Sequence, residues 1–376
     1  MTRVLLAPDK FKGTLTAAEV AAHLTTGLRS VLPDVDVRVV PVADGGDGTL
    51  AAAQAAGFTR MPVTATGPTG LPHESAFGQR GTEAVVELAE VSGLAQLPDG
   101  HPQPLTATSR GTGELVAAAL DSGARRIVVG IGGSACTDGG AGLLQALGAR
   151  ITTASGEPVG PGGAGLAQAA RLDLDGLHPA LADAELVVAC DVDNPLTGAR
   201  GAAAVYGPQK GAAPQDVEAL DRALARWADL VAAATGEDHR DDPGAGAAGG
   251  VGFGLVAVLG ARTRPGADLV FELTGLHDAL AEADLVVTGE GSLDAQTLHG
   301  KAPAAVAAAA RDRDLPVVAV AGRVALTAGE LAAAGVGAAY ALVDEAGDPR
   351  EPFEAPGPLL ERIGARIARE HLGAGC

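Results

Sequence analysis

Short β-rich runs alternate along this chain with Ala/Leu-rich stretches that have helical periodicity. The run at residues 4–7 is followed by a helical stretch at 17–28, and the run at 127–130 is followed by one at 140–147. This rhythm is typical of βαβ units and predicts the α/β class. Further strands are predicted at residues 186–189, 285–288, 317–321 and 339–343.

Both ends of the chain have the pattern of compact βα units, whereas the middle is more irregular. A chain of 376 residues is long enough for two domains. We therefore expect one doubly wound, flavodoxin-like or Rossmann-like α/β domain built from residues 1–62 and 284–376. A larger mixed α/β domain, residues 63–283, would be inserted into it.

The charge of the chain limits its partners. A formal net charge of -19 opposes the extended cationic surface that nucleic acid requires, so no nucleic-acid partner is expected. An acidic protein that binds anionic substrates must concentrate its few cations locally. Lysine and arginine residues inside motifs are therefore informative.

The hydrophobic runs and the cysteines indicate the compartment. No apolar run approaches the roughly 20 residues of a membrane span, and the start lacks a signal-peptide pattern. Cys136, Cys190 and Cys376 form no CxxC pair, which favours a reducing compartment and small buried side chains. We expect a soluble, cytoplasmic protein without a membrane partner.

The first strand is predicted to end in a charged loop, residues 7–14, with Lys10 and Lys12 beside Asp9. Open α/β sheets bind ligands outside the carboxyl ends of their strands. The loop is therefore a candidate phosphate site, and a solvated charged loop is the alternative.

The second strand is followed by Asp44, two glycines, Asp47, Gly48 and Thr49. Glycines expose backbone N–H groups to phosphate, and Asp44 and Asp47 could hold magnesium. The alternative is a turn in which Asp47 or Thr49 caps a helix that begins near Leu50. The string at 45–49 also occurs in NAD kinases, diacylglycerol kinases and phosphofructokinases, so it signals phosphotransfer without naming the acceptor.

Residues 108–114 combine hydroxyls with Arg110 before a predicted helix at 115–120. Arg110, Thr112 and free N–H groups at a helix start suit a carboxylate or a phosphate. A capping box built on Thr112, with Arg110 on the surface, is an equal alternative.

A glycine loop follows the strand at 127–130 and extends to residue 142. A dinucleotide fingerprint is disfavoured because no acid ends a strand about 20 residues later. A nucleotide-phosphate loop explains its polar residues, whereas close packing explains only its glycines. The candidate ligands are Gly132, Gly133, Ser134, Thr137 and Asp138.

Two more strand ends carry acids. Asp191 and Asn194 follow the strand at 186–189, and Glu290 and Asp294 precede Lys301 near the strand at 285–288. The pair 300–301 lacks the spaced glycine and the hydroxyl residue of a P-loop. Nearby, Lys210 lies in a predicted turn, where an exposed lysine is as plausible as a ligand.

The histidines show no ligand spacing, so no structural metal is predicted. Trp227 lies in an apolar helical stretch and is expected in the core.

Taken together and in this order, the motifs resemble those of the bacterial glycerate kinases, which include the glycerate 2-kinases of glyoxylate and sugar-diacid breakdown. The resemblance implies two α/β domains with the active site in their cleft, Mg-ATP as donor and 2-phosphoglycerate as the usual product. It also implies D-glycerate and ATP as small-molecule partners of a monomer or homodimer. The segments that carry it are residues 7–14, 43–49, 108–114, 132–142, 191–196, 207–211, 249–254 and 289–301.

Phosphoryl transfer requires cations on the transferring group, magnesium between the phosphates and an acid that orients the acceptor hydroxyl. We assign Asp191 to orient the glycerate hydroxyl. Lys12 and Lys301 would neutralise phosphate charge, and Asp44 or Asp47 would hold magnesium. Arg110 would pair with the glycerate carboxylate. The other expected contacts are Lys10, Thr112 and Asn194 for the substrate, and Gly132, Gly133, Ser134, Thr137, Asp138, Glu290 and Asp294 for ATP.

Three alternatives stay open. The acceptor could be the 3-hydroxyl of glycerate, since both transfers need the same residue types. The string at 45–49 also fits a kinase with a larger acceptor, such as NAD or a lipid. A non-catalytic relative that binds glycerate or a nucleotide is disfavoured because a binding protein needs no poised acids.

Overall fold

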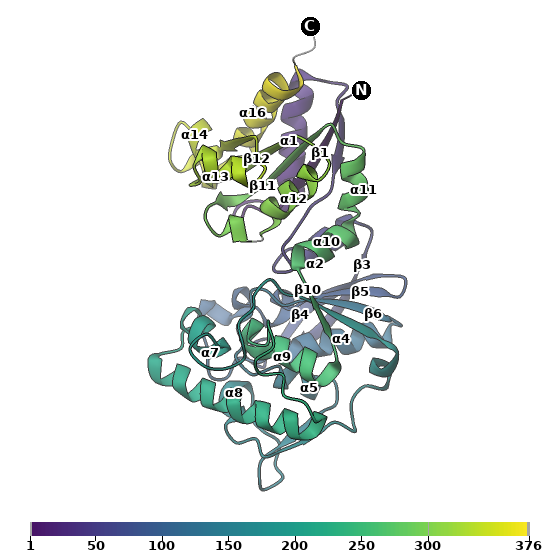
Figure 1. Cartoon of the computed structure of the whole chain (residues 1–376), viewed down its shortest axis with the longest axis vertical. Helices are drawn as coiled ribbons and strands as arrows, with labels where there is room; N and C mark the ends of the chain where they lie inside the picture. Colours follow the sequence, from purple (N-terminus) through teal and green to yellow (C-terminus); the bar gives the residue numbers. More distant parts are fainter. Residues whose placement is uncertain (1, 300, 374–376) are drawn as a thin grey trace. The chain divides into compact units, whose positions relative to one another are not determined.

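The computed structural model describes residues 2–299 and 301–373 and confirms the α/β class. Two compact units are present (Figure 1). The first unit consists of residues 1–44, 51–56 and 270–376, and the second of residues 45–50 and 57–269. Cys376 lies outside the described residues.

The first unit is built on a parallel sheet of five strands in the order β13-β12-β11-β1-β2. When the five strands are renumbered in chain order and the sheet is read from β2, the order is 2-1-3-4-5. This order is characteristic of flavodoxin-like doubly wound folds. The strands are β1 (Arg3–Pro8), β2 (Asp36–Val39), β11 (Leu285–Leu293), β12 (Val317–Val324) and β13 (Ala338–Ala341).

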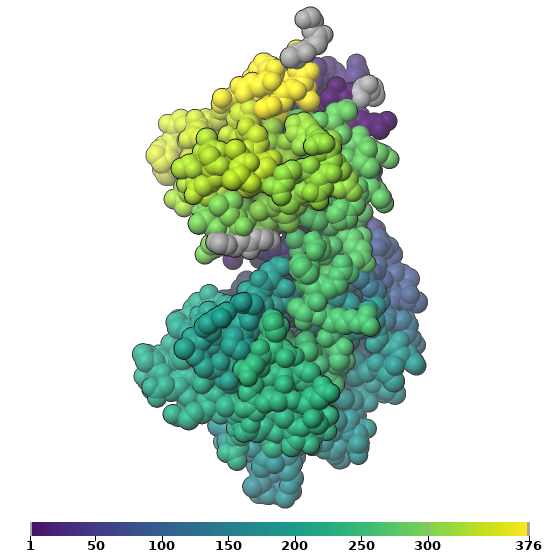
Figure 2. Space-filling view, viewed as in Figure 1, coloured from purple at the N-terminus to yellow at the C-terminus, as the bar shows by residue number. Residues whose placement is uncertain are grey.

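The two ends of the chain meet in the first unit through α1 (Ala17–Val31) and α16 (Pro356–Ile367), which pack against each other. A capping box starts α1, because Thr16 Oγ1 accepts the Glu19 N–H while the Glu19 carboxylate accepts the Thr16 N–H. Figure 2 shows residues from both termini on one face of this unit. Its other helices are α11 (Leu276–Ala281), α12 (Ala302–Arg311), α13 (Ala328–Ala333), α14 (Leu342–Glu345) and α15 (Glu351–Glu354).

The second unit contains a mixed sheet of six strands in the order β10-β9-β6-β5-β4-β3. Its β10, β9, β6 and β5 are parallel, whereas β4 and β3 are antiparallel. The strands are β3 (Thr59–Thr66), β4 (Pro72–Arg80), β5 (Glu83–Glu87), β6 (Arg126–Gly130), β9 (Glu185–Ala189) and β10 (Arg262–Arg264), with a separate hairpin of β7 (Arg150–Thr152) and β8 (Arg171–Asp173).

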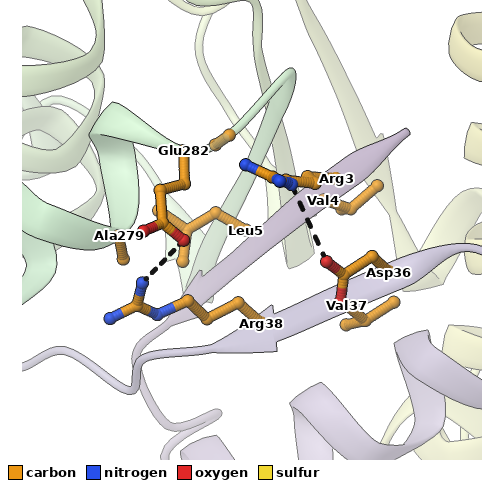
Figure 3. A pocket seen from close by; sticks show the side chains of 9 residues that line it. Arg3, Val4, Leu5, Asp36, Val37, Arg38, Ala279 and Glu282 are labelled. Carbon is orange, nitrogen blue, oxygen red and sulfur yellow. Dashed lines mark hydrogen bonds and ion pairs between the residues drawn. The ribbon is translucent and has the colours of Figure 1, made fainter. Parts of the chain in front are cut away.

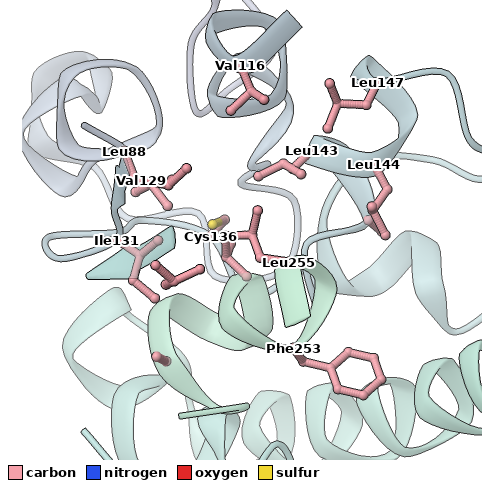
Figure 4. Close-up of a cluster of buried hydrophobic side chains, with 14 of the residues drawn as sticks. Leu88, Val116, Val129, Ile131, Cys136, Leu143, Leu144, Leu147, Phe253 and Leu255 are labelled. Atoms are coloured by element: carbon pink, nitrogen blue, oxygen red, sulfur yellow. The ribbon is translucent and has the colours of Figure 1, made fainter. Parts of the chain in front are cut away.

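Apolar side chains from the sheet and helices of the second unit form one core, part of which is drawn in Figure 4. Cys136 is buried in it, as predicted, and Cys190 is partly buried. Trp227 is completely buried, which confirms its expected packing. The helices of this unit are α3 (Ala89–Ser92), α4 (Arg110–Asp121), α5 (Ala141–Ala146), α6 (Gly162–Leu166), α7 (Ala202–Tyr206), α8 (Pro214–Thr235) and α9 (Ala247–Leu259).

The units differ from the predicted boundaries in three places, the first of which is residues 45–50, which belong to the second unit. Residues 57–62 belong to the second unit because β3 pairs with β4 along its whole length. Residues 270–283 belong to the first unit, where α11 packs against β1. The helices α2 (Thr49–Ala55) and α10 (Gly266–Thr274) each carry the chain from the second unit into the first.

Local predictions differ from the structure mainly at the ends of elements. The predicted helix at 115–120 begins five residues earlier, at Arg110, so Arg110 and Thr112 lie in its first turn. Within the described part of the chain, every helix is too short or too polar to cross a membrane.

Candidate active site

Acidic side chains gather at the carboxyl edge of the parallel sheet in the first unit. Asp9 directly follows β1, Glu290 lies in the neighbouring strand β11, and Asp44 lies in the loop after β2. The Asp9 N–H donates to the Gly289 carbonyl at 2.8 Å and so continues the pairing of the two strands. The chain leaves β1 and β11 in opposite directions along the sheet, and this switch point is where doubly wound folds bind ligands.

Two of these acids, Asp9 and Glu290, have raised pKa values. Burial, together with the negative charges of Asp44 and Glu290, raises the pKa of Asp9 to about 7, although Lys10 opposes the shift. Burial also raises the pKa of Glu290. The Glu290 carboxylate accepts from Thr297 Oγ1 at 2.6 Å and from Lys301 Nζ at 3.2 Å. A carboxyl with a pKa near 7 can accept a proton at physiological pH.

The predicted cations and acids of the first unit lie along this edge. The backbone N–H of Lys10 donates to Asp9 Oδ1 at 2.7 Å, whereas Lys12 is exposed. Lys301 precedes α12 and pairs with Glu290. Asp294 accepts the Gln296 N–H at 2.9 Å in the turn after β11. Lys301, Glu290 and Asp294 thus belong to one short segment, as their spacing predicted.

In the second unit, the loop at 45–49 packs against the end of β6. A Cβ on Gly130 would lie 2.6 Å from the Gly45 carbonyl oxygen, and one on Gly132 would lie 2.6 Å from the Gly46 Cα. Real Cβ atoms do not approach so closely, so these glycines permit the contact of two backbones. Close packing, the alternative weighed for the glycine loop, therefore accounts for Gly132.

Glu87, which the motif analysis did not include, holds the same loop. It ends β5, is 1% exposed, and its carboxylate accepts the Gly48 N–H at 3.1 Å and the Leu50 N–H at 2.8 Å. Burial raises its pKa to about 7, and the charges of Glu90 and Asp47 add to the effect. Asp47 itself is exposed. In the sequence, the clue that could have identified Glu87 is its position directly after the apolar run at 84–86.

Asp138 ties the glycine loop to the start of α4. Its buried carboxylate accepts the Ser109 N–H at 2.8 Å, the Ser109 hydroxyl at 2.9 Å and the N–H groups of Gly140 and Gly142. Because these donors already occupy Asp138, the structure gives it a role in shaping the loop.

Two more polar residues of the glycine loop, Thr137 and Ser134, are buried. Thr137 is completely buried, and among the described residues its Oγ1 is the buried side-chain polar atom without a hydrogen-bond partner. Ser134 accepts from Lys210 Nζ at 2.8 Å. Gly133 has a φ of +73°, which a residue with a side chain rarely adopts.

Lys210 is buried, in contrast to the exposed lysine considered from the sequence. It is 2% exposed, and its ammonium also donates to the Cys136 carbonyl at 2.5 Å. Burial lowers the pKa of Lys210. Lys210 therefore holds the glycine loop through Ser134 and the Cys136 carbonyl.

The start of α4 does not form the predicted capping box. Ser109 occupies the N-cap, and the buried Thr112 hydroxyl donates to Ser92 Oγ at 3.0 Å. Arg110 is exposed and pairs with Glu114 at 3.0 Å. Arg110 can reach solvent anions, whereas the Thr112 hydroxyl is committed to the interior.

The loop after β9 presents Asp191 at the carboxyl edge of the second sheet. Asp191 is exposed, and its Oδ1 accepts the Gly266 N–H at 2.9 Å. The Asn194 side chain donates to the Arg200 carbonyl at 2.8 Å and accepts from the Tyr206 hydroxyl at 2.6 Å. Both ends of the Asn194 amide thus stabilise the loop.

The donor chemistry of the first unit suits magnesium, which prefers carboxylate oxygens and keeps waters and substrate phosphates in its shell. Asp44 supplies such an oxygen, and a cation bound there would offset part of the negative charge that acts on Asp9. Among residues 2–299 and 301–373, no three His, Cys, Asp or Glu side chains form a ready metal site. One or two carboxylates are sufficient for a magnesium ion that arrives with phosphates.

A pocket beside β1, β2 and α11 provides a contrast (Figure 3). Its charges are paired with each other, since Arg3 lies 3.9 Å from Asp36 and Arg38 lies 3.4 Å from Glu282. It contains none of the predicted site residues, and we assign it no ligand.

Comparison with known proteins identifies the family. The model of the glycerate kinase family matches residues 4–372. The chain is 45% identical over 369 residues to a glycerate kinase of Bacillus subtilis and 41% identical over 370 residues to a glycerate 2-kinase of Escherichia coli, with 97% of each chain covered in both cases. A crystal structure assigned to a glycerate kinase 2 of Salmonella typhimurium LT2 superposes with a TM-score of 0.87 at 41% identity and covers 99% of this chain and 98% of its own. The chain therefore belongs to the glycerate kinase family, a family of kinases.

Proposed function

We propose that this protein transfers the γ-phosphoryl group of Mg-ATP to the 2-hydroxyl of D-glycerate and releases 2-phospho-D-glycerate and ADP. One observation carries the proposal beyond family membership. Asp9, with a pKa of about 7, lies at the switch point of a doubly wound sheet together with Lys10 and Lys301. An acceptor for a hydroxyl proton and cations for phosphate are what phosphoryl transfer requires.

Two carboxylates compete for the acceptor hydroxyl. In the proposed reaction the hydroxyl proton passes to a carboxylate, the hydroxyl oxygen bonds to the γ-phosphorus, and the bond from that phosphorus to the ADP oxygen breaks. Asp191 is the assignment from sequence, and its exposure leaves it accessible to substrate. The raised pKa of Asp9 favours Asp9 as the base, which leaves Asp191 to orient glycerate.

Cations complete the proposed site. Lys10, Lys12 and Lys301 would offset phosphate charge, and the exposed Arg110 would pair with the glycerate carboxylate. Magnesium, held by Asp44 or Asp47, would neutralise charge between the phosphates. The glycine loop, with the unpartnered Thr137 hydroxyl and Gly133, would contribute to ATP binding. Asp138, Thr112 and Asn194 shape this proposed site through the bonds described above, and Asp294 orders the turn before Lys301.

A coupled ADP-release assay tests the proposal. Mg-ATP is supplied with D-glycerate, L-glycerate, NAD, a diacylglycerol or buffer alone, and phosphorus NMR identifies the phosphorylated carbon. We expect turnover that depends on D-glycerate, with phosphate on carbon 2. A 3-phosphate would move the assignment to a glycerate 3-kinase, and activity on NAD or lipid alone would replace the acceptor. Binding of glycerate without turnover would indicate a non-catalytic relative.

Asp9→Asn and Asp191→Asn separate the two candidate bases. Loss of the base lowers kcat, whereas loss of an orienting contact mainly raises the KM for glycerate. If Asp191→Asn lowers kcat and Asp9→Asn does not, the base is Asp191.

A further inference from the structure

We propose that a cavity in the first unit, here called the Phe353 pocket, binds the base and ribose of the nucleotide, with Lys12 and Arg323 toward its phosphates. This inference rests on the proposed function and adds to it the place of the nucleotide. The cavity has a volume of about 250 Å³ and is bounded by the β1–α1 loop, β11, β12, α14 and α15.

The position of the pocket is the first argument. Gly291, Ser292, Gly322 and Arg323, from the carboxyl-terminal parts of β11 and β12, lie on one side of it. The pocket therefore opens at the edge of the parallel sheet where doubly wound folds bind ligands. Gly291 lies directly beside Glu290 in the sequence, so the pocket adjoins the acidic cluster of the switch point.

Two of the residues that line the pocket, Gly291 and Gly322, have no side chain. A Cβ on Gly322 would lie 2.6 Å from the Gly291 carbonyl oxygen, and a Cβ on Gly291 would lie 3.4 Å from the backbone nitrogen of Lys12. Without side chains at these positions, backbone forms this side of the cavity. A flat ligand can approach such a surface closely.

Apolar side chains exposed to solvent are the second argument. Phe353 is 72% exposed and Val343 is 44% exposed, and both line the pocket with the buried Phe11 and Pro352. An exposed phenylalanine beside a cavity is a ready stacking surface for a base. Glycerate offers no apolar face to these side chains, whereas a nucleotide base does.

The charge of the lining is the third argument. The formal net charge of the chain is -19, yet the pocket lining contains two cations and no carboxylate. Neither Lys12 nor Arg323 forms an ion pair with any described residue. Cations left available beside an apolar cavity complement a ligand with an apolar body and an anionic tail.

The size of the cavity fits part of a nucleotide. Sites that enclose a whole drug-sized ligand have volumes of roughly 300–1,000 Å³. The Phe353 pocket is slightly smaller, so it would enclose the base and sugar and leave the phosphates at its mouth. The pocket in Figure 3 has a similar volume, about 240 Å³, but its charged side chains are already paired.

Calorimetric titration of the full chain with ADP and, separately, with inorganic triphosphate tests the pocket. We expect Phe353→Ala to weaken ADP binding roughly 5- to 150-fold and to leave triphosphate binding unchanged, because only ADP has a base to stack. Arg323→Gln should weaken both ligands. Circular dichroism checks that each variant is folded, which the exposure of Phe353 favours.

Two matched variants serve as controls. Leu71→Ala removes an apolar side chain that is 61% exposed on the β3–β4 hairpin, and Arg29→Gln removes an exposed cation in the last turn of α1. Both should bind ADP as the wild type does. An ADP affinity for Phe353→Ala within about twofold of wild type would overturn the proposal, as would a wild type that binds no ADP.

The same variants separate this inference from the proposed function. Normal glycerate-dependent turnover with unchanged ADP binding in Phe353→Ala would reject the pocket and leave the function in place. ADP binding that depends on Phe353, without turnover on glycerate, would reject the function and leave the pocket. A dimer that dissociates in Phe353→Ala with unchanged ADP affinity would overturn the proposal in favour of an interface between two copies.

Discussion

The ammonium group of Lys210 donates a hydrogen bond of 2.8 Å to Ser134 Oγ. Lys210 reaches this position from the turn before α8, and Ser134 lies in the glycine loop after β6. A lysine from a distant segment thus supplies hydrogen bonds to the loop. Burying the Lys210 ammonium group costs free energy, and this burial lowers the pKa of Lys210.

Lys210→Met should destabilise the protein by about 1–3 kcal/mol, because the Cys136 carbonyl and Ser134 lose their donor. The lowered pKa means that the unfolded chain binds more protons than the folded one below the ordinary lysine value. Wild-type stability should therefore rise relative to Lys210→Met as the pH increases toward that value. Urea unfolding at several alkaline pH values measures the difference, and a constant difference would contradict the assignment.

Asp9→Asn should lower kcat by about 10²- to 10⁴-fold if Asp9 is the general base. In the wild type, the activity should rise with pH through a midpoint near 7, where Asp9 becomes ionised. The rates of wild type and variant are compared across that range. An ascending limb that survives in Asp9→Asn would assign the titration to another group.

Asp9 also affects stability in a direction that can be measured. The pKa of Asp9 is raised in the folded state, so its ionisation destabilises the folded protein. The wild type should therefore lose stability as the pH rises to about 7. Asp9→Asn keeps an oxygen that can accept the Lys10 N–H. The variant should therefore gain stability relative to wild type between about pH 4 and pH 8 in thermal denaturation.

Glu87→Gln should destabilise the second unit by roughly 1–3 kcal/mol, since one amide oxygen cannot replace both carboxylate oxygens that accept from Gly48 and Leu50. Because the pKa of Glu87 is raised in the folded state, its contribution to wild-type stability is largest at low pH and is lost as the pH rises to about 7. The cost of the substitution should fall from about pH 5 to pH 8. Glu74→Gln, which alters an exposed acid on β4, is the control for urea unfolding and should show no such trend.

Local sequence patterns predicted most elements because each βα unit has its own periodicity. They also placed acids and cations after strands, and the cluster of Glu290, Asp294 and Lys301 follows from spacing within one segment. The contacts of Glu87 could not be predicted in this way. They depend on the position of β5 beside β6 and on the loop at 45–49, and the order of strands in a sheet is a non-local property.

Lys210 illustrates the same limit. Its neighbours in sequence describe a polar turn, and Gly211 with a φ of +87° confirms that turn. The burial of the side chain comes from the glycine loop about 75 residues earlier, which only the tertiary structure brings into contact. The neighbours of Thr112 likewise suggested a capping box, whereas α4 begins at Arg110 and the Thr112 hydroxyl donates to Ser92 Oγ.

Gly27 provides a final prediction about the first unit. A Cβ on Gly27 in α1 would lie 2.1 Å from the Glu361 carbonyl oxygen of α16 and 2.9 Å from the Ala365 nitrogen. Both atoms belong to the backbone, so α1 and α16 would have to separate. Gly27→Ala should therefore lower the free energy of unfolding by about 1–3 kcal/mol, although alanine is the better helix former.

Gly329→Ala is the matched control, because Gly329 lies in α13 with no atom within 4 Å of its added Cβ. It should stabilise the protein by about 0.4–1 kcal/mol through the lower entropy of the unfolded chain. Urea unfolding of both variants compares the same chemical change at two sites. Equal effects would show that helix propensity alone decides, and a loss confined to Gly27→Ala would show that the contact between α1 and α16 holds the two ends of the chain together.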